Sequence, residues 1–143
     1  MMKIRNCNKA DIRNIYDLIC ELEDKDFDYE KFKTIFDIKL NNNNCLYIVG
    51  IEDDTIIAFL SLNIDYQLHH TKKVGTIEEL IVNEKYRSKG VGKILLDNAI
   101  EYAKTKNCEI VELTSNLTRE KAHNFYIKNG FNKSSYKFVM KLI

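Results

Sequence analysis

Arg87-Ser88-Lys89-Gly90-Val91-Gly92-Lys93 is the stretch of this 143-residue chain that decides the fold. It follows the apolar run Leu80-Ile81-Val82 and precedes a helix-like repeat of apolar residues. Two glycines one residue apart let backbone amides approach a ligand without an intervening side chain, and the start of a helix attracts negative charge. Arg87, Lys89 and Lys93 add positive charge. The stretch therefore predicts a strand–turn–helix unit that holds a phosphate group.

The glycine loop departs from two widespread phosphate-binding patterns. The pattern G-x-x-x-x-G-K-S/T is absent from the sequence, and a dinucleotide-binding fingerprint would need a third glycine where Leu95 stands. By itself, R-x-x-G-x-G also fits an ordinary strand–helix turn with solvated lysines. A second motif is needed to indicate which phosphate compound is held.

Length and composition predict one globular domain over residues 1–143. The 22 Lys and Arg against 21 Asp and Glu leave a net charge of +1, so no overall charge drives the molecule toward nucleic acid or an anionic membrane. No apolar run reaches the ~20 residues that span a bilayer, and no signal-peptide pattern opens the chain, which predicts a cytoplasmic protein. Disulfides are not expected between the widely separated cysteines Cys7, Cys20, Cys45 and Cys108.

Apolar spacing predicts a mixed α and β chain around one sheet. Helices are expected at 12–22, 29–40, 90–103 and 119–129, with Gly130 just past the last one. Strands are expected at 45–51, 55–66, 76–82, 108–114 and 135–142. A polar loop is expected at 67–73.

The second motif is Ala122-His123-Asn124-Phe125-Tyr126-Ile127-Lys128-Asn129-Gly130-Phe131. The small side chain of Ala122 permits close approach of a ligand, and the phenol of Tyr126 one turn later can donate a proton. Taken alone, an adjacent Phe-Tyr pair is more often part of the core. On a helix, one side collects Arg119, Ala122, His123 and Tyr126.

In this order and spacing, the two motifs resemble the GCN5-related N-acetyltransferase (GNAT) family. The stretch 87–92 is similar to the family's pyrophosphate loop, and 122–131 to its second acetyl-CoA motif. The resemblance implies the GNAT fold, an α/β single domain whose splayed, mostly antiparallel sheet is flanked by helices, and it implies acetyl-CoA as cosubstrate. The cofactor-binding residues that it implies are Leu80, Ile81, Val82, Arg87, Ser88, Lys89, Gly90, Val91, Gly92, Lys93, Asn116, Arg119, Ala122 and Phe125.

The same resemblance implies catalytic roles. Backbone amides of residues 80–82 would polarise the thioester carbonyl, and Tyr126 would protonate the departing CoA thiolate as general acid. The chain departs from the family at one position, because many relatives carry an Asn about seven residues before the tyrosine, where Arg119 stands here. Asn116 lies three residues earlier, so both residues are candidates for the cofactor contact.

The acceptor amine must lose a proton before it attacks. Glu78 and Glu79 are carboxylates in an otherwise apolar strand. In a regular strand they point to opposite faces, with Glu79 on the face of Ile77 and Ile81. We expect Glu79 to be the base, acting through water, with Glu78 as the second choice. A surface carboxylate paired with a nearby lysine is the plainer interpretation of either.

A closer resemblance, to aminoalkylphosphonate N-acetyltransferases, rests on short matches at 18–22, 68–70, 75, 77–82, 112–116 and 136–138. In that subgroup a Glu commonly stands at position 79, which supports this residue as base. Such enzymes are associated with stimulation by a divalent metal, for which His69-His70 is the candidate pair. Adjacent residues on an extended segment point in opposite directions, so no metal ligand is assigned.

We therefore expect direct transfer of an acetyl group from acetyl-CoA to a primary amine of a small molecule, with an aminoalkylphosphonate as the candidate acceptor. No cysteine lies beside a histidine in an acyl-enzyme motif, which argues against a ping-pong mechanism. The open alternatives are a polyamine, an aminosugar or a protein amine as acceptor, and a non-catalytic acyl-CoA-binding module. A homodimer is common in the family, although no segment of the sequence marks an interface.

Overall fold

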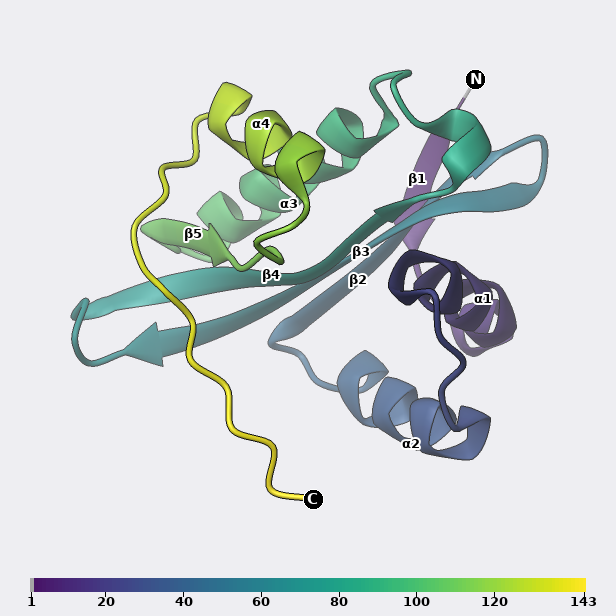
Figure 1. The fold of residues 1–143 in the computed structure, drawn as a ribbon, viewed down its shortest axis with the longest axis horizontal. Coiled ribbons are helices and arrows are strands. Elements are labelled where there is room, and N and C mark those ends of the chain that lie inside the picture. The colour runs from purple at the N-terminus through teal and green to yellow at the C-terminus, as the bar shows by residue number, and fades with distance from the viewer. Residues whose placement is uncertain (1) are drawn as a thin grey trace.

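The computed structural model describes residues 2–143, and these are built around one five-stranded sheet (Figure 1). The first four strands pair antiparallel, and the fifth pairs parallel to the fourth. The α/β class and the mostly antiparallel sheet are as predicted. In chain order, which is also their order in space, the strands are β1 (Lys3–Asn6), β2 (Cys45–Glu52), β3 (Thr55–Gln67), β4 (Lys72–Val82) and β5 (Ile110–Leu113).

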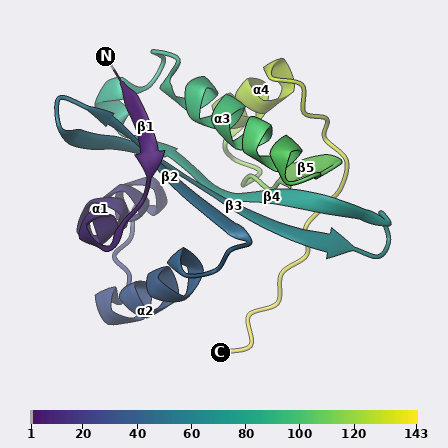
Figure 2. The ribbon, with the colours of Figure 1, turned by 180° about the vertical axis from the view of Figure 1, so that it is seen from behind.

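Helices cover both faces of the sheet (Figures 1 and 2). One face carries α1 (Ile12–Glu23) and α2 (Tyr29–Leu40), and the other carries α3 (Val91–Thr105) and α4 (Glu120–Lys128). Two short 3-10 helices, η1 (Lys9–Asp11) and η2 (Glu84–Tyr86), precede α1 and α3. Each of the four predicted helices is present, with ends within two residues of those predicted.

The core lies in two clusters that the sheet separates. Because helices cover both faces of β3, residues 57–62 are all buried instead of alternating with exposed ones. Phe59 packs in the cluster around Ile15 of α1, whereas Leu60 packs in the cluster around Leu95 of α3. A polar side chain on β3 or β4 therefore meets different surroundings on the two faces.

β4 carries one extra residue at one point of its pairing with β3. Ser61 pairs with Glu79 and the next residue of β3, Leu62, pairs with Ile77, which leaves Glu78 without a partner in this ladder. Such a bulge bends the strand and shifts the alternation of its side chains by one residue. Ile77 accordingly lies in the α3 cluster and Ile81 in the α1 cluster.

β5 accompanies β4 over only part of its length. Its last residue, Leu113, pairs with Ile77, and among the described residues no strand pairs with β4 on that side from 78 to 82. The sheet therefore splits at the bulge. The split is the predicted splay, and it leaves main-chain groups of residues 80–82 at an open edge.

The strand predictions were incomplete at two places and wrong at one. β1 is only four residues long and mostly exposed, so it has no alternation that could reveal it. β4 begins at Lys72, which shortens the predicted loop to 68–71. The strand predicted at 135–142 is wrong, because these residues form no regular structure and their apolar side chains, such as Phe138, are exposed. Alternation predicts a strand only where a neighbour completes its hydrogen bonds, and this segment instead extends away from α4 (Figures 1 and 2).

Candidate active site

The glycine loop forms the entrance to α3. Ser88 and Gly90 both have left-handed backbone angles, with φ of 63° and 81°. A Cβ at Gly90 would have no atom within 4 Å, and Gly90 caps α3 without a side-chain hydrogen bond to the first turn. The N–H groups of Val91 and Gly92 are therefore not taken by a capping side chain, and the helix end adds partial positive charge. This geometry fits a phosphate group.

The three cations of the loop are held in different ways. Arg87 Nε donates to the carbonyl oxygen of Val82 at 3.0 Å, which ties the loop to the end of β4. Lys93 is paired with Asp97 one turn along α3, at 2.8 Å. Lys89 Nζ lies 5.7 Å from the centroid of the Tyr86 ring. Within residues 2–143, Lys89 forms no ion pair with a carboxylate, and we expect it to be the most available cation.

The two sequence motifs meet where α4 packs on α3. A Cβ at Gly92 would lie 3.5 Å from Cζ of Phe125 and 3.7 Å from Cγ2 of Val82. These are ordinary van der Waals distances, so the ring of Phe125 rests on the backbone of the glycine loop and beside the end of β4. The second motif thus lies directly against the first, as their joint prediction requires.

Tyr126 is half-buried beside this contact. Its ring lies 5.4 Å from that of Phe125 and 5.8 Å from that of Phe131, measured between centroids. Burial raises the pKa of the Tyr126 phenol, and the charge of Arg119 opposes this rise. The phenol therefore stays protonated at neutral pH, which is the state a general acid needs.

The loop before α4 and the first turn of this helix contain the remaining predicted cofactor contacts. Oδ1 of Asn116 accepts hydrogen bonds from the N–H and the hydroxyl of Thr118, at 3.0 and 2.9 Å, so this side chain already shapes the loop. Nε2 of His123 lies 2.7 Å from the carbonyl oxygen of Asn116 and fastens α4 to the same loop. Arg119 is exposed and directly precedes α4, and Ala122 is half-buried in the first turn of this helix.

Glu79 belongs to a row of three side chains that crosses the sheet on the face covered by α1 and α2. Strand pairing puts Tyr47 of β2 beside Ser61 of β3, and Ser61 beside Glu79. The Ser61 hydroxyl donates to Oε1 of Glu79 and accepts from the main-chain N–H of the same residue, the latter at 3.0 Å. Burial raises the pKa of Glu79, and the hydrogen bond from Ser61 opposes this rise. A half-buried carboxylate with a raised pKa is suited to general base catalysis.

Glu78 lies on the same side of the sheet as Glu79, so the prediction that they point to opposite faces is wrong. Oε1 of Glu78 is 3.5 Å from Nζ of Lys39 in α2, and the charge of Glu78 contributes to the raised pKa of Glu79. The bulge is the physical reason, since the extra residue interrupts the alternation. For the same reason Glu79 shares its face with Ile81 and not, as predicted, with Ile77.

The end of β4 offers main-chain groups rather than side chains. Ile81 is 2% exposed in the α1 cluster, and Leu80 and Val82 pack against the α3 cluster. All three side chains thus serve the core. A ligand along this edge would contact their backbone, as the predicted stabilisation of a carbonyl oxygen requires.

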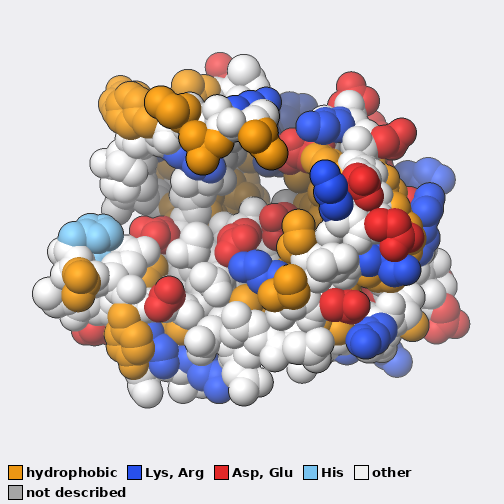
Figure 3. Space-filling model, turned by 90° about the horizontal axis from the view of Figure 1, so that it is seen from below, with side chains coloured by type: hydrophobic (Ala, Val, Ile, Leu, Met, Phe, Trp, Pro, Cys, Tyr) orange, Lys and Arg blue, Asp and Glu red, His pale blue; other side chains and the backbone are white. Residues whose placement is uncertain are grey.

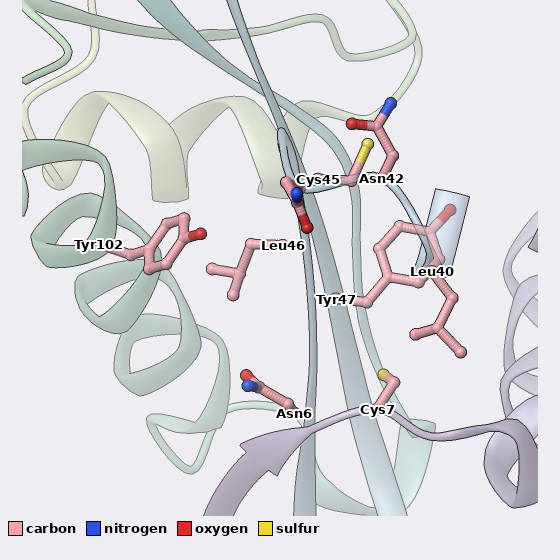
Figure 4. Close-up of a pocket in the computed structure, with 9 residues that line it drawn as sticks. Asn6, Cys7, Leu40, Asn42, Cys45, Leu46, Tyr47 and Tyr102 are labelled. Atoms are coloured by element: carbon pink, nitrogen blue, oxygen red, sulfur yellow. The ribbon is translucent and has the colours of Figure 1, made fainter. Parts of the chain in front are cut away.

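A cavity of about 260 Å³ opens near the other end of the row, where β1 stops short beside β2 (Figure 4). Its lining includes Tyr47, Cys7, Leu40 and Tyr102, and none of the predicted site residues. Burial raises the pKa of Cys7 to about 12, so this thiol is not a ready nucleophile. Figure 3 shows one face of the molecule with a hollow, around which acidic and basic side chains gather, with apolar ones along one rim.

Sequence reasoning missed Ser61 and Tyr47. A signal for Ser61 was present, because it is the one polar residue in the apolar run 57–62. Its pairing with Glu79 could not be read from the sequence, since the bulge sets that register.

The candidate metal pair lies in the β3–β4 turn. The rings of His69 and His70 are 4.2 Å apart, closer than an extended segment would allow, because the chain turns there. Among residues 2–143 there is no group of three or more His, Cys, Asp or Glu side chains that could hold a metal ion.

The fold and the two adjoining motifs are those of an acetyl-CoA-dependent acyltransferase, and comparison with known proteins identifies the class. The model of the acetyltransferase (GNAT) family matches residues 11–131, so the chain belongs to this family and is an N-acetyltransferase. Members of the family use acetyl-CoA as cosubstrate. Within the part of the chain that the structure describes, no helix is long and apolar enough to cross a membrane.

Individual proteins and solved structures are similar to this chain to different degrees. An aminoalkylphosphonate N-acetyltransferase of Salmonella typhimurium (strain LT2) is 32% identical over 98% of this chain and 91% of its own. A glucosamine 6-phosphate N-acetyltransferase of Trypanosoma brucei brucei is 40% identical over 42% of this chain and 39% of its own. Among solved structures, a transcriptional regulator from Bacillus halodurans C-125 superposes with a TM-score of 0.91 at 22% identity, covering 99% of this chain and all of the other, which shows the shared fold.

Proposed function

We propose that this protein transfers an acetyl group directly from acetyl-CoA to the primary amine of a small molecule that also carries a phosphorus oxyanion, with an aminoalkylphosphonate as the first candidate. The observation that carries the proposal is the carboxylate of Glu79. It is half-buried at the bulge where β4 parts from β5, and its pKa is raised. Glu79 would accept the ammonium proton through water, and Tyr126 would give a proton to the leaving thiolate.

The residues of the glycine loop and its surroundings suit the cosubstrate, which supplies the activated acetyl group. The open backbone at Gly90, the uncapped start of α3 and Lys89 would hold the pyrophosphate. In an antiparallel ladder the N–H groups of alternate residues point away from the partner strand, so those of Leu80 and Val82 face the open edge. They would stabilise the negative charge that develops on the thioester oxygen.

The choice of acceptor rests on relatives and on one local charge pattern. The two named relatives act on an aminoalkylphosphonate and on glucosamine 6-phosphate, and both compounds join an amine to a phosphorus oxyanion. On the face of Glu79, Nζ of Lys39 lies 3.5 Å from Oε1 of Glu78. A carboxylate for the ammonium and a lysine within reach of the anion would suit such a compound.

A panel of matched acceptors tests the proposal. Release of free CoA thiol is measured with an aminoalkylphosphonate and the same amine lacking the phosphonate, with glucosamine 6-phosphate and glucosamine, and with spermidine and a lysine peptide, each with and without divalent metal. We expect kcat/KM to be higher for the phosphorus-bearing member of each pair. Equal rates within the pairs, or activity on spermidine alone, would refute this acceptor class.

The catalytic assignment is tested separately. Glu79→Gln keeps the shape of the side chain and removes the base, so we expect kcat to fall by roughly 10²–10⁴-fold. The control is Glu101→Gln, which changes an exposed carboxylate on α3 that pairs with Lys104. Tight CoA binding without turnover on any amine would favour the alternative of a non-catalytic acyl-CoA-binding module.

The expected homodimer is a separate proposal. Light scattering of the same samples measures the mass of the particle and so tests it.

A further inference from the structure

Ser61 is a buried polar residue in an apolar run, and its hydroxyl has a specific partner. It is 3% exposed and lies between Leu60 and Leu62, which pack in the α3 cluster. A buried hydroxyl must be hydrogen-bonded to be tolerated. Both hydrogen bonds of Ser61 go to one residue, Glu79, whose carboxylate accepts and whose main-chain N–H donates.

This double contact fixes the carboxylate of Glu79 relative to its own backbone. One hydroxyl bridges the N–H and Oε1 of the same residue, so rotation of the glutamate side chain would break a hydrogen bond. The bridge also lies at the position where the bulge makes β4 irregular. The contact therefore orients a side chain at a point where the regular ladder does not.

We propose that Ser61 is a positioning residue for the general base: it holds the Glu79 carboxylate in one orientation and keeps it ionised. The proposal rests on the proposed role of Glu79. A hydroxyl that donates to a carboxylate stabilises the charged form, so loss of the hydroxyl favours the protonated, inactive form.

Other groups around Glu79 act on the same equilibrium. Glu78 of β4 and Glu23 of α1 favour the protonated form, whereas Lys39 of α2 favours the carboxylate. Tyr47 of β2 faces the same carboxylate; burial raises the pKa of this phenol, and the charge of Glu79 adds to the rise. The Ser61 hydroxyl, by contrast, donates a hydrogen bond to Glu79, so Ser61→Ala removes this hydrogen bond and leaves the surrounding charges in place.

The test is the pH dependence of Ser61→Ala. A hydrogen bond to a charged group corresponds to roughly one pKa unit or more, so we expect the acidic limb of kcat/KM to move to higher pH by about one unit. We expect kcat at neutral pH to fall, while the KM for acetyl-CoA stays unchanged. The matched control is Thr76→Ala, which removes a β4 hydroxyl that lies 3.4 Å from Glu112 and does not touch Glu79.

A second measurement is independent of turnover. With carboxyl-¹³C-labelled glutamate, the NMR titration of Glu79 in the whole protein should give a higher pKa in Ser61→Ala than in the wild type. A titration and an acidic limb that both stay in place would overturn the proposal. Should Glu79→Gln remain active, the role of Glu79 as base fails, yet the NMR titration still decides whether Ser61 controls its ionisation.

Two further variants, whose side chains have the same shape, test the proposal if Ser61→Ala does not fold. Ser61→Thr keeps the hydroxyl and Ser61→Val replaces it with a methyl group, so both place the same bulk in the sheet. We expect the Thr variant to retain the wild-type acidic limb and the Val variant to show the shifted one. Identical limbs in the two variants would contradict the proposal.

Discussion

The phenol of Tyr126 allows proton donation to be separated from cofactor binding, because its ring can stay when its hydroxyl is removed. We predict that Tyr126→Phe lowers kcat by roughly 10²–10⁴-fold. CoA binding should stay nearly unchanged, since the packing of this ring against Phe125 and Phe131 is kept. Steady-state kinetics and calorimetric titration with CoA measure the two effects.

The control for this variant is Tyr102→Phe, which removes a hydroxyl from α3 beside the separate cavity. If both variants lose the same fraction of activity, or if Tyr126→Phe weakens CoA binding in proportion to its loss of turnover, Tyr126 is not the general acid. The burial that raises the pKa of this phenol also predicts that its ionisation limits activity only in alkaline solution.

The entrance of α3 is an element whose fold and expected ligand depend on the same residues. At Gly90 there is room for a side chain, but the left-handed φ of 81° suits few residues other than Gly, Asn and Asp. We predict that Gly90→Asp weakens CoA binding at least about tenfold, because its carboxylate repels the pyrophosphate and opposes the helix end. Fluorescence titration with CoA gives the dissociation constants.

Gly90→Asn is the matched variant for this prediction. It has almost the same size and tolerance of the left-handed region as Asp but carries no charge, so we expect a much smaller loss of affinity. Equal losses in the two variants would mean that shape rather than charge matters at Gly90, and unchanged affinity in both would remove the loop from the cofactor site.

Elements with a strong local pattern could be predicted from the sequence, and those that depend on neighbours could not. α3 combines a glycine entrance with one apolar face, and α2 begins where Oδ1 of Asp28 accepts from the N–H of Lys31, at 3.1 Å. Both helices carry their own start signals. The strand predicted at 135–142 had the right alternation but no described partner, and the bulge in β4 exists only as a relation between two strands.

The site divides in the same way. The glycine loop and the Phe125–Tyr126 pair are local motifs, so the sequence was sufficient to single them out, whereas their contact through Gly92 required the structure. Glu79 was singled out as a carboxylate in an apolar strand. Its surroundings, including Ser61 and the placement of Glu78 on the same side, depend on strand register and could not be predicted from the sequence.

The stability of the whole molecule depends in part on the ion pair between Arg5 and Asp11. This pair links β1 to the start of α1. Two hydrogen bonds join the guanidinium and the carboxylate, at 2.7 and 2.9 Å, and Asp11 is only 4% exposed. Hydrogen bonding from Arg5 lowers the pKa of Asp11 below its ordinary value. The stabilisation is therefore complete above the pKa of the unfolded chain, near 4, and is lost as the pH falls through the lower pKa of the folded state.

We predict that Asp11→Asn lowers the free energy of unfolding by about 1–3 kcal/mol at pH 7, because the Arg5 guanidinium loses its charged partner. The difference from the wild type should shrink as the pH falls below about 4. Urea unfolding at several pH values measures both effects. A difference that does not change with pH would show that the carboxylate charge of Asp11 does not contribute to stability.

Glu78 is, in effect, an insertion into an otherwise regular strand. Without it, Ile77 and Glu79 would follow each other in ordinary alternation and would keep the faces that they occupy now. The ladder between β3 and β4 thus has no need of this residue. What the insertion changes is the path of the strand as it leaves β5 and the number of carboxylates that face α2. The bulge therefore lies in the part of β4 where we place the chemistry. A β4 without this residue could still pair with β3, but we expect it to position the groups of the active site less well.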